Sequence, residues 1–129
     1  MTVLDTHVLL WLANSPTRLS KPATSTIPVD GQVAVSAVTA YEIAYLALRK
    51  RLELDRPATE WIADALFEHE IELVPPNLDI AVRAGSLPTD RFPGDPADRL
   101  IYATAVERGA RLVSADQRLR DYDPARVVW

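Results

Sequence analysis

Four acidic residues stand where carboxylates could do chemistry together: Asp5, Glu42, Asp98 and Asp116. Asp5 and Asp116 each come shortly after a short apolar run that is typical of a β-strand. In open α/β sheets, ligands bind outside the carboxyl ends of the strands, so we expect these two side chains at that edge. Asp98 lies in the first turn of a helix that precedes a strand, which leaves its position relative to this edge open.

Glu42 is unusual because of its surroundings. It is the only charged residue between Asp30 and Arg49, in a segment made mostly of apolar residues. A buried or half-buried carboxylate there is costly unless something pairs with it. No nearby Lys or Arg in the sequence offers that pairing, and a metal ion would.

Each aspartate also has a purely structural explanation. Asp5 and Asp116 could be N-caps of the helices that follow them, since aspartate is a preferred N-cap residue. Asp98 could interact with a helix dipole. Asp95 is the best cap candidate, because Pro96 follows it at the first helical position. Taken one at a time, these aspartates are nearly as well explained by capping as by catalysis.

Taken together, the four carboxylates indicate a metal site. Carboxylates that are brought close to one another repel, and without a cation some of them have raised pKa values. Ligands that are all oxygen favour a hard ion such as Mg²⁺ or Mn²⁺. Zinc is disfavoured, because the chain has no cysteine and its two histidines, His7 and His69, are not at metal-ligand spacing. We interpret His7 as structural.

Several neighbours of the carboxylates could support them. Three hydroxyl residues qualify, although each is also a normal turn or cap residue: Thr6, Ser36 and Ser114. Arg99, next to Asp98, could contact a phosphate group or pair with an acid. We therefore expect these four residues near the site.

The elements that must position these residues alternate along the chain. Apolar patterns and caps predict strands at 2–4, 32–35, 71–74, 112–114 and 127–128. They predict helices at 6–13, within 20–27, and at 37–50, 57–69, 79–85, 96–108 and 117–121. This alternation indicates parallel pairing in a three-layer α/β/α sandwich around a mostly parallel sheet of four to five strands. We expect one domain, residues 1–129, without internal repeats.

The bulk composition leaves the binding partner open. A net charge of −4 speaks against nucleic acid, but a carboxylate site lowers the formal charge and bound divalent ions would offset it. The absence of cysteine suits a reducing cytosol. Neither a signal peptide nor a membrane helix, which needs about 18 apolar residues, is recognisable. We expect a cytoplasmic protein with no membrane contact.

The sequence as a whole resembles the PIN-domain ribonucleases, and in particular the VapC toxins of bacterial and archaeal toxin–antitoxin pairs. The third of its motifs is the most specific. The matching segments are Val3-Leu4-Asp5-Thr6-His7-Val8-Leu9-Leu10-Trp11; Val35-Ser36 with Tyr41-Glu42-Ile43-Ala44; Gly94-Asp95-Pro96-Ala97-Asp98-Arg99-Leu100-Ile101 followed by Ala103-Thr104-Ala105; Leu112-Val113-Ser114-Ala115-Asp116; and the ending Val127-Val128-Trp129.

The resemblance implies an Mg²⁺- or Mn²⁺-dependent endoribonuclease whose acidic residues are the four named above. Asp5 and Asp98 would hold the metal directly, and Asp116 directly or through water. Glu42 would orient or deprotonate the attacking water, and in-line attack would leave a 5′-phosphate and a 3′-hydroxyl. Such chemistry does not need the 2′-hydroxyl, so a preference for RNA would come from binding. Asp95 matches a further aspartate of the family, which we interpret as a helix cap.

The resemblance also implies partners, namely an RNA substrate, a VapB-like antitoxin bound in a groove between the early helices, and a second copy in a homodimer. Two positions depart from the family pattern: Leu46, where many relatives have lysine, and Pro93, where histidine is frequent. A haloacid-dehalogenase-type phosphatase is excluded, because it needs an aspartate where His7 stands. A non-catalytic PIN-fold module that binds RNA or protein remains the alternative, although it predicts loss of acidic residues and all four are present.

Overall fold

A five-stranded parallel sheet forms the centre of the computed structural model, which describes residues 1–29 and 31–129. Its strands follow the order β3-β2-β1-β4-β5, and each neighbouring pair is parallel. The strands are β1 (Thr2–Leu4), β2 (Val33–Ser36), β3 (Ile71–Val74), β4 (Arg111–Val113) and β5 (Val127–Val128). The expected α/β fold is confirmed, with a sheet that is parallel throughout.

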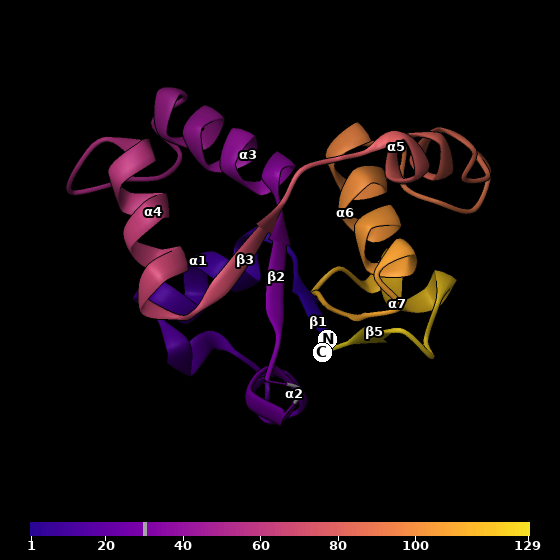
Figure 1. Ribbon diagram of the computed structural model, residues 1–129, viewed down its shortest axis with the longest axis horizontal. Coiled ribbons are helices and arrows are strands. Elements are labelled where there is room, and N and C mark those ends of the chain that lie inside the picture. Colours follow the sequence, from indigo (N-terminus) through magenta and orange to yellow (C-terminus); the bar gives the residue numbers. More distant parts are fainter. Residues whose placement is uncertain (30) are drawn as a thin grey trace.

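Helices cover both faces of this sheet. Figure 1 shows the sheet edge-on, with α1, α3 and α4 on one side and α5, α6 and α7 on the other. The helices are α1 (Thr6–Asn14), α2 (Lys21–Val29), α3 (Ala37–Leu48), α4 (Ala58–Glu68), α5 (Leu78–Gly85), α6 (Pro96–Glu107) and α7 (Gln117–Tyr122), with a 3₁₀ turn η1 (Pro16–Arg18). In the described part of the chain, no helix is long and apolar enough to cross a membrane.

Successive residues of the central strands β1 and β4 belong to different cores. Val3 packs in the core on the α6 side of the sheet, whereas its neighbour Leu4 packs in the core on the α1 and α3 side. Leu112 and Val113 of β4 divide in the same way, and all four side chains are fully buried. Side chains alternate between the faces of a strand, so a sheet covered on both faces needs continuous apolar runs. This requirement explains the apolar strands of the sequence.

The strand order creates a switch point at β1. The chain passes from β1 to β2 and β3 on one side, and then returns to β4 on the other side of β1. Such a switch leaves a crevice outside the carboxyl ends of the two central strands, where α/β sheets bind ligands. Asp5 and Asp116 follow these two strands, β1 and β4.

The helix boundaries differ from the predictions in two informative places. Helix α3 ends at Leu48 rather than at Lys50, because Lys50 has a positive φ of 57° that ends the helix. Helix α4 begins at Ala58, because the ψ of 144° at Pro57 is extended. Pro57 is therefore the N-cap residue of α4 and not its first helical residue.

The buried strands predict a large stability loss on truncation. Leu112 of β4 is fully buried, so Leu112→Ala is expected to lower the free energy of unfolding by about 2–5 kcal/mol. Leu78→Ala is the matched control, because that leucine is 78% exposed and its loss is expected to cost less than about 0.5 kcal/mol. Urea denaturation followed by circular dichroism measures both. Equal losses in the two variants would contradict the core described above.

Candidate active site

Asp5 lies at the carboxyl ends of β1 and β4, and its hydrogen bonds connect the segments that follow these two strands. It is the N-cap of α1, and its Oδ1 accepts a hydrogen bond from the backbone N of Thr6 at 2.8 Å. Its Oδ2 accepts a hydrogen bond from the hydroxyl of Ser114, just beyond β4, at 2.6 Å. The capping role and a role in the site are therefore compatible, since the two oxygens of Asp5 face different partners.

Asp116 begins α7 and is bound by an arginine. Its backbone N donates to Ser114 Oγ at 3.1 Å, so the serine hydroxyl contacts both aspartates. Asp116 is the N-cap of α7, and its Oδ1 accepts from the backbone N of Arg118 at 2.9 Å. The Arg118 guanidinium binds both carboxylate oxygens, with Nε 3.1 Å from Oδ1 and Nη2 2.7 Å from Oδ2. This fork-shaped contact is a strong ion-pair geometry.

Glu42 accepts a hydrogen bond from a residue in the first turn of α1. The hydroxyl of Thr6 donates to Glu42 Oε1 at 2.5 Å, and the hydroxyl of Thr39 lies 3.2 Å from that of Thr6. Thr6 and Thr39 are both buried. Thr39 was missed in the sequence analysis. It stands three residues before Glu42, on the same helix face, and a second polar residue there was a usable signal.

Asp98 lies in the first turn of α6, directly after the cap. Asp95 is the N-cap of that helix and accepts from the backbone N of Ala97 at 2.8 Å, as predicted. The side chain of Asp98 is only 18% exposed, and its Oδ2 lies 3.7 Å from Nη2 of Arg118. Arg118 thus reaches two of the four carboxylates. It too was missed, although a cation at the start of a helix is electrostatically unfavourable and so points to an acidic partner.

The carboxylates influence one another's protonation. Burial and then the negative charges of Asp5, Asp95, Glu42 and Asp116 raise the pKa of Asp98 to about 7. Burial also raises the pKa values of Asp5 and Glu42, although the hydroxyls of Ser114 and Thr6 oppose this effect. Asp116 is the exception, because the hydrogen bond from Arg118 lowers its pKa. The four predicted acids therefore share one electrostatic site.

Two of the predicted supporting residues serve the scaffold instead. The guanidinium of Arg99 donates from Nε to the carbonyl of Ala84 at 3.0 Å and from Nη2 to that of Leu87 at 2.6 Å. These bonds fasten α6 to the end of α5, so Arg99 differs from the expected phosphate or acid contact. Ser36 is fully buried, and its Oγ accepts from the backbone N of Val38 at 3.2 Å as the N-cap of α3.

The donor chemistry of the site fits a hard divalent cation. Its ligand atoms would all be carboxylate oxygens, and burial, followed by neighbouring negative charges, raises the pKa values of Asp5, Glu42 and Asp98, so a cation would stabilise their charged forms. In the described residues, however, no three acidic or histidine side chains are gathered closely enough to form a ready metal site. An ion would therefore have to draw these oxygens together, including the Asp116 oxygens that Arg118 contacts.

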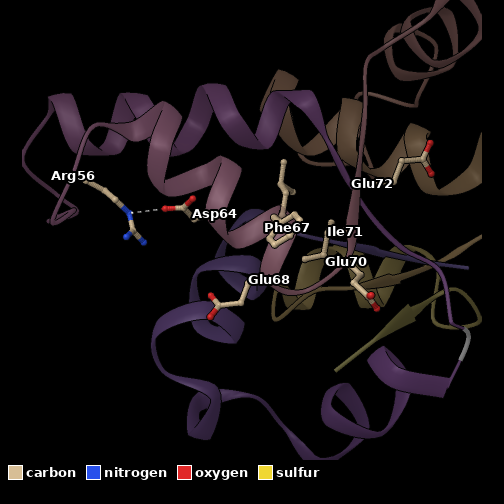
Figure 2. A pocket seen from close by; sticks show the side chains of 8 residues that line it. Arg56, Asp64, Phe67, Glu68, Glu70, Ile71 and Glu72 are labelled. Atoms are coloured by element: carbon tan, nitrogen blue, oxygen red, sulfur yellow. Dashed lines mark ion pairs between the residues drawn. The ribbon is translucent and has the colours of Figure 1, made fainter.

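Another acidic hollow lies elsewhere on the surface. It has a volume of about 1070 Å³ and lies where α4 leads into the edge strand β3. Figure 2 shows Asp64 paired with Arg56, at 3.4 Å, and the side chains of Glu68, Glu70 and Glu72 pointing in different directions. These acids do not converge on one point, and they lie near the amino end of β3. The carboxylates at the carboxyl ends of the strands, whose charges act on one another, are the better site.

The raised pKa of Asp98 predicts how stability depends on pH in the metal-free protein. The folded protein keeps this proton up to about pH 7, whereas an unfolded aspartate loses it near its ordinary pKa of 3.8. The folded state then binds more protons, so the free energy of unfolding falls as the pH rises from about 4 to 7. Asp98→Asn is expected to flatten this fall, as urea denaturation in EDTA would measure.

The exposed Asp90 supplies the control, since Asp90→Asn should keep the pH profile of the unmodified protein. Parallel profiles for Asp98→Asn and the unmodified protein would show that Asp98 is not protonated in the folded state.

Comparisons with known proteins agree on one family. The model of the PIN domain family matches residues 2–124. The chain is 44% identical over 129 residues to "Ribonuclease VapC22" of Mycobacterium tuberculosis, an alignment that covers 98% of this chain and 97% of that protein.

Solved structures share the fold at low sequence identity. The VapBC2 structure from Rickettsia felis, bound to a DNA fragment from its promoter, matches with a TM-score of 0.70 at 14% identity, over 98% of this chain and 96% of that one. The DNA-bound VapBC structure from Salmonella typhimurium matches with a TM-score of 0.69 at 17% identity, over 98% and 95% of the two chains. With a family model that matches nearly its whole length and a relative at 44% identity, the chain belongs to the PIN domain family.

Proposed function

We propose that this chain is a divalent-metal-dependent endoribonuclease of the cytoplasm and the toxin of a toxin–antitoxin pair. The observation that carries the proposal is the meeting of Asp5, Glu42, Asp98 and Asp116 in one electrostatic site at the carboxyl edge of a PIN-domain sheet. A relative that is 44% identical to this chain bears the name of a ribonuclease, which supports RNA as the substrate class.

The metal ligands of this proposal are Asp5 and Asp98, with Asp116 binding directly or through water. Mg²⁺ or Mn²⁺ is the expected ion, because carboxylate oxygens select hard cations. A bound divalent ion supplies positive charge at the phosphate and lowers the pKa of a water molecule. Ser114 orients this ligand set, since its hydroxyl contacts both Asp5 and the backbone of Asp116.

Glu42 is the proposed group that orients the attacking water and accepts its proton. A general base works best when its pKa lies near the working pH, and burial shifts the pKa of Glu42 upward in that direction. The hydroxyl of Thr6 binds one of its oxygens at 2.5 Å and leaves the other for the water. Thr6 thereby positions a base whose own helix, α3, is otherwise mainly apolar.

Asp5→Asn is the decisive variant for this function. The purified protein is expected to cleave RNA with Mg²⁺ or Mn²⁺ and to stop when EDTA removes the ion. Asp5→Asn is expected to abolish cleavage while the circular dichroism spectrum stays unchanged, because the amide can still cap α1 but carries no charge for the metal. The measurement is the appearance of cleavage products that carry a 5′-phosphate.

Asp64→Asn is the matched control, because this aspartate lies in the other acidic hollow and its loss should leave cleavage intact. Cleavage that persists in EDTA or in Asp5→Asn contradicts the mechanism. Binding of RNA without any cleavage by the unmodified protein would instead favour a non-catalytic binding module.

A groove between α1 and α3 supports the antitoxin part of the proposal. It has a volume of about 570 Å³ and combines apolar with basic side chains, among them Trp11, Leu46, Arg18 and Arg51. The guanidinium of Arg18 lies 4.7 Å from the ring centre of Trp11, which is a cation–π contact. An aromatic side chain in a mixed groove of this kind is a typical anchor for a protein partner.

Trp11→Ala is expected to weaken binding of a VapB-like antitoxin by about tenfold or more, because aromatic anchors dominate such interfaces. Surface plasmon resonance measures the affinity. Phe67→Ala is the control, since Phe67 is 87% exposed and lies outside the groove. If both variants bind the antitoxin equally well, and thermal melts show both to be folded, the antitoxin does not use this groove.

A homodimer is also part of the proposal. Large apolar side chains are exposed on α3 and α5, and exposed apolar patches mark interaction surfaces. They include Tyr41, Leu48, Leu78 and Val82.

A further inference from the structure

Arg118 contacts the carboxylate site, but the proposed reaction gives it no role. We propose that Arg118 is an exchangeable counter-ion: it neutralises Asp116 and Asp98 in the metal-free protein and, once a divalent ion binds these acids, its guanidinium binds a phosphate of the RNA. The proposal rests on the proposed function. It adds a phosphate-binding residue to the site and a competition between that residue and the metal.

The contacts show that Arg118 occupies oxygens that the metal would need. Its Nη2 lies 2.7 Å from Asp116 Oδ2 and 3.7 Å from Asp98 Oδ2, so one nitrogen lies against two of the proposed ligands. A guanidinium and a divalent ion at the same oxygens repel each other and compete for the same lone pairs. Binding of the ion must therefore displace the guanidinium, at least from Asp98.

The position of Arg118 makes such a displacement easy. Its side chain is 64% exposed, whereas those of Asp98 and Asp116 are 18% and 21% exposed. Because the guanidinium is already largely exposed, water can solvate it when it leaves, which offsets part of the loss of this fork-shaped ion pair. The arginine can turn into the solvent while the two acids remain in place.

A phosphate group is the partner that suits the released guanidinium. The planar fork of arginine matches phosphate oxygens as well as it matches a carboxylate. The chain has a net charge of −4, so binding a polyanion requires local cations near the site. Arg118 meets this need at the rim of the carboxylates. Two other arginines of the same region are engaged within the fold: Arg99 with the carbonyls of Ala84 and Leu87, and Arg120 with Gln117 Oε1 at 2.5 Å.

The competition is tested by metal binding without RNA. Arg118→Gln is expected to bind Mn²⁺ about fivefold or more tightly than the unmodified protein, because coupling between competing ligands is reciprocal. Isothermal titration calorimetry measures the affinity. Arg108→Gln is the matched control, since Arg108 also binds both oxygens of a carboxylate, those of Glu72 at 3.0 and 3.1 Å, but at the far end of α6. Equal or weaker Mn²⁺ binding by Arg118→Gln would overturn the exchange.

The phosphate contact is tested by the salt dependence of RNA cleavage at saturating Mn²⁺. Loss of one phosphate contact is expected to make the negative slope of log kcat/KM against log salt shallower by about 0.7, the value for single strands. Arg118→Gln should raise KM and keep kcat, whereas Arg108→Gln should change neither the slope nor KM. An unchanged slope in Arg118→Gln, together with an unchanged KM, would overturn the phosphate contact.

The two measurements also separate this inference from the proposed function. If the unmodified protein cleaves no RNA, the proposed function fails and the phosphate contact fails with it, while the calorimetry still decides whether Arg118 competes with the ion. If the unmodified protein cleaves RNA but Arg118→Gln behaves like Arg108→Gln in both measurements, the inference alone is wrong. Arg118→Lys refines the result, because lysine keeps the charge but lacks the planar fork of the guanidinium. This variant should restore the salt slope of the unmodified protein more fully than it restores the KM.

Discussion

Like charges held close together in a partly buried space impose the central constraint on this protein. Four carboxylates reach one edge of the sheet, and Asp98 is affected by the charges of the other three. The fold compensates in three ways. Hydroxyl donors bind Asp5 and Glu42, an arginine binds Asp116, and the proton that Asp98 retains to about pH 7 removes one charge. Each compensation is partial, which leaves the site receptive to a cation.

Two of these charged residues have two roles, because they also cap helices. Asp5 and Asp116 satisfy the free N–H groups at the starts of α1 and α7, and the same side chains present oxygens to the site. Helix capping thereby fixes one oxygen of each carboxylate in place. The strands that precede these caps lie between two hydrophobic cores, so the site stands on a part of the fold that has little freedom to move.

Much of this arrangement could be predicted from the sequence, because it depends on local patterns. The short apolar runs, the Ser36 and Asp95 caps and the alternation of strands and helices are local, and the structure confirms them. The contacts between distant residues could not be predicted in this way. Thr6 binds Glu42 36 positions away, and Ser114 binds Asp5 109 positions away, so both contacts depend on the strand order. Arg99 differed from expectation because the carbonyls at the end of α5 were closer partners than any acid.

The hydroxyl of Ser114 has a consequence for how the two strand ends influence each other. The hydroxyl of Ser114 donates its one proton to Asp5 Oδ2, while its oxygen accepts a hydrogen bond from the backbone N of Asp116. The three groups form a relay with one direction, from the loop after β4 to the loop after β1. Since each hydrogen bond in a chain polarises the next, the bond from Asp116 strengthens the bond that Ser114 donates to Asp5. The two aspartates and the serine between them therefore form one hydrogen-bonded unit.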